Sequence, residues 1–77
     1  MEINDFISKF ASQFDETDAA EFTAETVFKD LAEWSSLMSL SIIAMADEEY
    51  SVKVKGDDIK NAATIQDLFE VVVSRMN

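Results

Sequence analysis

The chain contains no cysteine and no histidine among its 77 residues. Without cysteine, neither a disulfide framework nor a thiolate metal site can hold the fold. Without either residue type, the Ser-His and Cys-His pairs of nucleophilic enzymes are impossible. No spacing in the sequence specifically supports a Ser-Lys pair or a pair of catalytic carboxylates. We therefore expect a protein that is not an enzyme.

Basic residues are scarce as well. Six lysines and arginines stand against sixteen aspartates and glutamates, which gives a formal net charge of -10. Such a charge repels nucleic acid and anionic membranes and favours partners with basic docking patches. Hydrophobic residues make up 48% of the chain, a share high enough to argue against intrinsic disorder. We expect a single domain over residues 1–77, near the lower limit for a self-sufficient core.

The sequence has no segment typical of a signal peptide or a membrane span. It begins acidic and passes directly into an amphipathic pattern, unlike a secretory signal. No apolar stretch is long enough to cross a bilayer. We expect a cytoplasmic protein that does not insert into membranes.

A calcium sensor is also excluded, although the chain is acidic. An EF-hand loop requires glycine at its sixth position and glutamate at its twelfth. Residues 47–58 have the right length, but Val52 and Asp58 occupy these two positions. No metal site is therefore predicted.

The apolar residues of the first segment recur at the spacing of one helical face, which predicts a helix ending near Asp15. This face consists of Ile3, Phe6, Ile7, Phe10, Ala11 and Phe14. The connection that follows, up to Ser35, is long for a compact domain. We expect it to contain a helical turn and to be pinned over the helices by apolar anchors. These anchors are Phe22, Val27, Phe28, Leu31 and Trp34.

A second helix is predicted from Ser36 to about Tyr50. Ile42 and Met45 widen its apolar surface. The stripe that we expect to be buried consists of Leu37, Leu40, Ile43, Ala44 and Tyr50. Residues 51–55 alternate like a strand but have no evident pairing partner, so an extended connection is predicted with its two valines turned inward. These valines are Val52 and Val54.

The remaining residues predict a short helix and a closing helix. Gly56 permits a turn, and Asp57 can cap the short third helix. The apolar residues of that helix are Ile59, Ala62 and Ala63. Thr64 and Asp67 approach a capping box at the start of the last helix. Its apolar face consists of Ile65, Leu68, Phe69, Val72, Val73 and Met76. These elements predict an all-α protein, a small antiparallel four-helix bundle with three longer helices, one short helix and a long first loop.

The segment 26–31, the tetrapeptide Trp34-Ser35-Ser36-Leu37 and a following helix that ends in Asp-Glu-Glu-Tyr resemble the acyl carrier protein family. The order of the other elements is also similar, so the resemblance covers essentially the whole chain. The family's attachment motif is usually Asp-Ser-Leu, and here Ser35 replaces the aspartate. The distance to the acidic cluster before Tyr50 assigns Ser36 as the modified residue, with Ser35 as the alternative.

The resemblance implies a monomeric carrier on which partner enzymes act. A phosphopantetheinyl transferase, using Mg²⁺, would attach 4'-phosphopantetheine from coenzyme A to the hydroxyl of Ser36. A helix start suits the resulting phosphodiester, because free amides and the helix dipole favour negative charge. Synthases and acyltransferases would then build or move acyl chains held as thioesters, in fatty-acid, polyketide or specialised lipid biosynthesis. The departures from the family around Ser36 favour a specialised set of partners.

These departures also predict a docking surface that depends less on salt bridges than is usual in the family. Ser35, Met38 and Ser41 stand where acids often occur in relatives. The predicted docking residues are Glu33, Leu37, Met38, Ser41, Asp47 and Glu48, of which Leu37 and Met38 are the apolar contacts. Exposed ion pairs are worth about 0–1 kcal/mol each, so the acids would steer association more than hold it.

An apolar cargo must either stay exposed or enter between the helices. Small side chains in the second and third helices make a partly hollow bundle conceivable, although the same side chains would equally allow close helix packing. The candidate pocket residues are Phe6, Ala44, Val54, Ile59, Ala62 and Leu68.

Two alternatives stay open beside the acyl carrier. The first is a carrier of aminoacyl or peptidyl groups, and the second is an acidic helical adaptor that docks a basic partner without modification. Modification of Ser36 separates the adaptor from both carriers, and analysis of the thioester cargo separates the two carriers.

Overall fold

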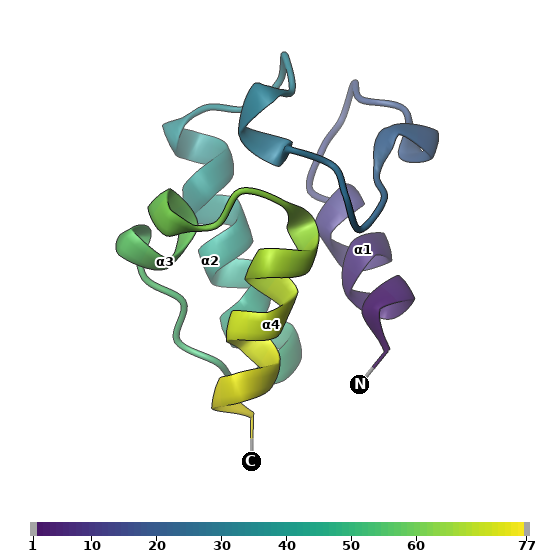
Figure 1. Ribbon diagram of the computed structural model, residues 1–77. Helices are drawn as coiled ribbons and strands as arrows, with labels where there is room; N and C mark the ends of the chain where they lie inside the picture. The colour runs from purple at the N-terminus through teal and green to yellow at the C-terminus, as the bar shows by residue number, and fades with distance from the viewer. Residues whose placement is uncertain (1, 77) are drawn as a thin grey trace.

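Four α-helices and two 3₁₀ turns form the described part of the chain, residues 2–76 of a computed structural model (Figure 1). The elements are α1 (Ile3–Ala11), η1 (Ala19–Glu21), η2 (Phe28–Asp30), α2 (Ser36–Tyr50), α3 (Gly56–Asn61) and α4 (Ile65–Arg75). Helix α1 contacts α2 and α4, and α3 contacts the same two helices. The prediction of an all-α protein is confirmed.

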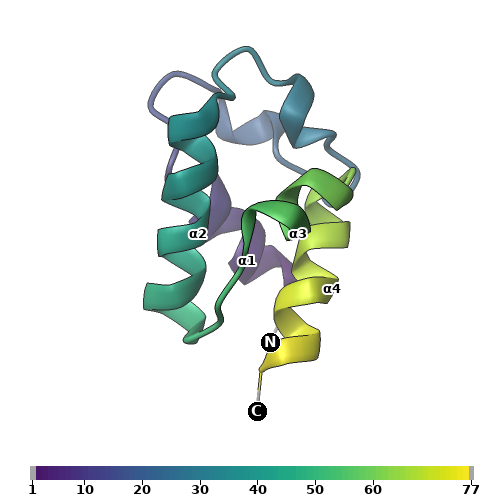
Figure 2. The same ribbon diagram turned by 90° about the vertical axis from the view of Figure 1, so that its left-hand side faces the viewer.

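The antiparallel arrangement is not confirmed. Helices α2 and α4 run in the same direction, and only α1 runs opposite to both (Figures 1 and 2). The reason is the extended segment of residues 51–55, which carries the chain back along the bundle before α3 begins (Figure 2). Val52 and Val54 in this segment are buried, as predicted, and anchor it to the core.

Aromatic side chains hold the first half of the chain together around Phe10, which is fully buried. The ring of Phe10 lies 5.7 Å from that of Phe14, 6.1 Å from that of Phe22 and 5.5 Å from that of Phe28, measured between centroids. Trp34 completes the cluster at 4.9 Å from Phe28. Of the predicted loop anchors, Phe22 and Phe28 are buried and Leu31 and Trp34 pack against the core, whereas Val27 is 45% exposed.

Helix α1 ends earlier than predicted, at Ala11. The amides of Gln13 and Phe14 donate to the carbonyls of Phe10 and Ala11 at 3.2 and 3.0 Å. These bonds span three residues and tighten the last turn. The tighter turn keeps Phe14 in the core, which explains why the apolar period continues beyond the helix.

Helix α2 has the predicted bounds, but its buried face was predicted wrongly. Its buried residues are Ile42, Met45 and Ala46, whereas Leu37 and Leu40 are 74% and 61% exposed. Ala44 is exposed too, and Ile43 and Tyr50 are partly buried against the core. Apolar residues occur on every side of this helix, so periodicity alone could not choose the inward face.

The turn predicted at Gly56 is also wrong. Ser51 adopts the left-handed conformation that ends α2, with φ 56° and ψ 37°, whereas Gly56 is the first residue of α3. The residue before this helix is Lys55, whose amide donates to the Asp58 carboxylate at 2.8 Å. Asp57 therefore does not cap α3.

The last two helices are tied by local and long-range polar contacts. The predicted capping box of Thr64 and Asp67 at the start of α4 is present. At the other end of α4, Arg75 donates to both carboxylate oxygens of Asp58, at 2.6 and 2.8 Å, and to the carbonyl of Lys53 at 2.9 Å. Arg75 thus joins α4 to α3 and to the extended segment. On α4, Ile65, Leu68 and Val72 are buried, whereas the outer members of the predicted apolar face, Val73 and Met76, are 43% and 37% exposed.

The backbone at Ser51 and Gly56 predicts two stabilising substitutions. Ser51→Gly should raise the free energy of unfolding by about 0.5–1 kcal/mol, because glycine adopts positive φ without strain. Gly56→Ala should raise it by about 0.4–1 kcal/mol through a less flexible unfolded chain, because a Cβ at this position meets no atom within 4 Å. Urea unfolding followed by circular dichroism measures both. A lower midpoint for Gly56→Ala would contradict the assigned start of α3.

Candidate attachment site at the start of α2

Two adjacent serines stand at the start of α2, and their side chains have different structural roles. Ser35 is the N-cap: its backbone is extended and its side-chain oxygen accepts a hydrogen bond from the amide of Met38 at 3.3 Å. Ser36 is the first residue of the helix and is exposed. Within residues 2–76, Ser36 has no side-chain hydrogen bond to another residue. One hydroxyl is therefore used by the helix, and the other faces solvent at a helix N-terminus, where amide donors remain available.

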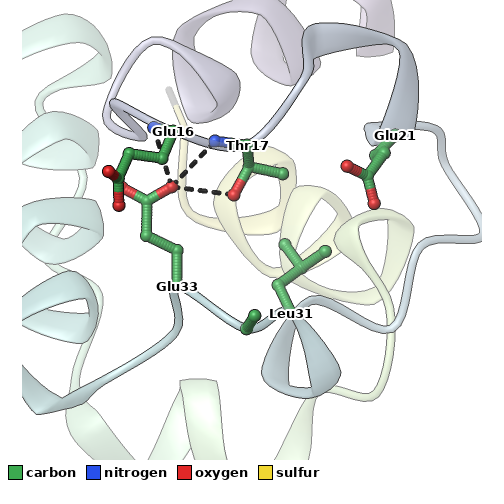
Figure 3. A pocket seen from close by; sticks show the side chains of 6 residues that line it. Glu16, Thr17, Glu21, Leu31 and Glu33 are labelled. Carbon is green, nitrogen blue, oxygen red and sulfur yellow. Dashed lines mark hydrogen bonds between the residues drawn. The ribbon is translucent and has the colours of Figure 1, made fainter.

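The chain is held firmly just before these serines. Both oxygens of the Glu33 carboxylate accept hydrogen bonds: Oε2 from the amide of Asp15 at 2.9 Å, and Oε1 from the amides of Glu16 and Thr17 at 3.0 and 2.9 Å. The Thr17 hydroxyl adds a fourth bond at 2.7 Å (Figure 3). Trp34 follows in the aromatic cluster, stacked at 6.3 Å on Phe14. The hydroxyl of Thr17 and the amide of Asp15 hold the pKa of Glu33 below its ordinary value.

The outer face of α2 near Ser36 is apolar and free of charge. Leu37 and Leu40 project to solvent one turn apart, and the helix carries no charged residue before Asp47. Met38, predicted as a docking contact, instead packs against the core and is only partly exposed. Ser41 is also partly buried. Leu40 is the exposed apolar residue that sequence reasoning missed, because it was assigned to the buried stripe.

The acids predicted for docking do not form one surface. Glu33 lies just before α2, whereas Asp47 and Glu48 lie about 17 Å farther along the helix axis at 1.5 Å per residue. Asp47 pairs with Lys53 at 3.0 Å, and the neighbouring Glu49 lies 3.6 Å from Lys9. Glu48 is exposed and makes no salt bridge within the described residues. Most of these charges are thus already engaged within the molecule.

The predicted pocket residues lie in a closed core. Five of them are buried: Phe6, Val54, Ile59, Ala62 and Leu68. Ala44 is exposed on α2 and does not join them. Two pockets on the described surface measure about 260 and 430 Å³. The first lies between the loop and Glu33, the second along α1, and neither is lined by a predicted pocket residue.

Comparison with known proteins gives two similar sequences. Curated proteins named acyl carrier protein from Myxococcus xanthus and Micrococcus luteus are each 29% identical to this chain over 55 residues. The aligned region covers 71% of this chain and 70% and 68% of those proteins. The predicted resemblance to the acyl carrier protein family is confirmed. No family model and no solved structure matches the chain. None of the described helices has the length and apolar character needed to span a membrane.

The hydrogen-bonded carboxylates predict loss of stability in acid. The guanidinium of Arg75 lowers the pKa of Asp58, and the amides of Ala63 and Thr64 lower the pKa of Asp67. The pKa of Glu33 is lowered in the same way by its hydrogen bonds. Folded-state values below the ordinary values of about 4 mean that the stabilisation is complete above about pH 4.5. It is lost as the pH falls through the folded values.

Urea midpoints between pH 7 and pH 3 measure this dependence. The wild type should lose stability on acidification, and Glu33→Gln should lose less over the same interval because one of the titrating groups is gone. Equal losses in the two proteins would contradict the role of Glu33.

Proposed function

We propose that the protein is an acyl carrier whose 4'-phosphopantetheine arm is attached to Ser36. The observation that carries the proposal is the division of roles at the start of α2. There the Ser35 hydroxyl caps the helix, and the exposed Ser36 hydroxyl makes no hydrogen bond to residues 2–76. The similarity to two acyl carrier proteins supports the carrier role in general. The protein would then be a substrate and scaffold for partner enzymes and not itself an enzyme.

The chemistry fits this position. In the transferase reaction the Ser36 oxygen would form a bond to the phosphorus that carries the pantetheine half of coenzyme A, and the bond to the adenosine bisphosphate half would break. The hydroxyl proton passes to a base of the transferase. The phosphodiester product carries a negative charge, which the N-terminus of the 15-residue helix α2 favours. The thiol at the end of the arm would hold the acyl group as a thioester.

Intact mass after incubation with coenzyme A, Mg²⁺ and a broad-specificity phosphopantetheinyl transferase tests the site. The wild type and Ser35→Ala should gain the mass of one arm, and Ser36→Ala should gain nothing. Ser35→Ala should lose about 1 kcal/mol of stability with its cap, so the assay is run well below its unfolding midpoint. A gain lost only in Ser35→Ala would move the site by one residue.

No gain in the wild type with several transferases would overturn the carrier and favour the unmodified adaptor. Where the wild type is modified, mass analysis of the thioester on protein from its native host separates acyl cargo from aminoacyl or peptidyl cargo. It also indicates whether the pathway makes fatty acids, polyketides or a specialised lipid.

We further propose that partner enzymes contact Leu37 and Leu40, with charge in a minor role from Glu48. Leu37→Ser and Leu40→Ser should each raise the KM of the transferase for this protein several-fold without lowering its stability, because both side chains are exposed. Met38→Ser is the matched control: its side chain packs on the core, so this change should lower the urea midpoint. The effects on KM should persist at high salt, since apolar contacts are not screened.

Dependence of the wild-type KM on ionic strength, with no effect of the leucine substitutions, would contradict this surface. The partners would then dock through charge.

A further inference from the structure

The Glu33 carboxylate occupies a cradle formed by the backbone. Three successive amides, from residues 15–17, point at its two oxygens together with the Thr17 hydroxyl. Successive backbone N–H groups of this kind bind anions, and here the anion is a side chain of the same chain. Figure 3 shows Glu33 reaching across from the segment before α2 to meet Glu16 and Thr17.

The surroundings show that hydrogen bonding, not general electrostatics, holds Glu33. Glu16 and Glu21 line the same surface pocket, and Asp15 follows the end of α1, so the neighbouring charges are negative. Desolvation opposes the ionised form of Glu33. Its pKa is nevertheless lowered by its donors. Both of its oxygens are already bound, which leaves this acid poorly placed to meet a basic partner.

The segment that Glu33 holds, residues 15–21, contributes no buried side chain to the core. Between the buried residues Phe14 and Phe22, every residue is exposed or only partly buried. On the other side of the contact, Glu33 is followed directly by Trp34 in the aromatic cluster, Ser35 in the N-cap and then Ser36. Three consecutive residues are therefore fixed, each by a different interaction, before the serine proposed for modification.

We propose that Glu33 is a positioning residue for the modification of Ser36, a role that rests on the proposed carrier function. By binding the amides of residues 15–17, Glu33 fixes the direction from which the chain enters α2. The backbone at Ser36 is thereby held in one position relative to the docking residues on the same helix. Loss of the contact removes one of the three interactions that fix the chain before Ser36, and it releases the amides of residues 15–17.

The test compares Glu33→Gln and Thr17→Val with Arg75→Gln. The first two weaken the contact from its two sides. Arg75→Gln is the matched control, because it removes an equally well bonded tie between α3 and α4, a contact that does not involve the residues before Ser36. Transferase kinetics are measured with varied carrier concentration at saturating coenzyme A, at a temperature where circular dichroism shows all the proteins folded.

We expect Glu33→Gln to lower kcat about tenfold and Thr17→Val to lower it less, since misplacement of a reacting group by about 1 Å can cost up to about 100-fold. KM should stay within about twofold, because Leu37 and Leu40 are unchanged. Arg75→Gln should lose stability and keep the wild-type kcat. An effect of Glu33→Gln on KM alone, suppressed by salt, would identify a docking acid and overturn the proposal.

Wild-type kinetics in Glu33→Gln, or equal loss in Arg75→Gln, would also overturn the positioning role while leaving the carrier function intact. Failure of the wild type to be modified at all would instead overturn the carrier function on which the role rests. Should Glu33→Gln fold poorly, Thr17→Val alone decides, because it removes one hydroxyl and keeps the charge of Glu33 in place.

Discussion

The packing of aromatic rings around Phe10 is the interaction on which the first half of the molecule depends. Residues 12–35 contain only two 3₁₀ turns, and a connection of this length has little stability of its own. Phe14, Phe22, Phe28 and Trp34 all meet Phe10. Each such pair contributes about 0.5–1.5 kcal/mol beyond the burial of its area. The cluster thus turns a long loop into a fixed layer over one end of the helices (Figure 1).

Charge is distributed unevenly over this frame. The whole net charge of -10 falls within residues 1–49, and the remaining residues contain as many basic as acidic side chains. Yet α2 is uncharged over its first three turns. Several acids before and at the end of α2 are engaged: Glu33 by amides, Asp47 by Lys53 and Glu49 by Lys9. Most of the negative charge therefore lies on the loop of residues 12–35, and the surface next to Ser36 is apolar.

Local rules in the sequence were enough for some features and not for others. The bounds of α2 and the capping box of Thr64 and Asp67 were predicted correctly, because caps act over three or four residues. The inward face of α2 was not predicted correctly. Apolar residues lie on all sides of this helix, and the packing of the neighbouring elements decides which of them are buried. The contacts of Glu33 join residues that are separated by 16 to 18 positions in the sequence. A local sequence pattern therefore cannot predict them. The left-handed conformation of Ser51 was not predicted, because the turn was assigned to the nearby Gly56.

The serine at position 35 links these features. The attachment motif of the family that the sequence resembles usually has aspartate at this place, and either side chain can accept a hydrogen bond from the first turn of the helix. Ser35 keeps the cap but removes the negative charge next to Ser36. A carboxylate at this position would supply a docking charge, and it would lie next to the phosphodiester that we propose for Ser36. With serine, the helix start keeps its order and loses that charge, while Leu37 and Leu40 stay exposed beside it. Under the proposed carrier function, the position of Ser36 would then depend on Glu33, Trp34 and the cap, and partner recognition would depend on apolar contact.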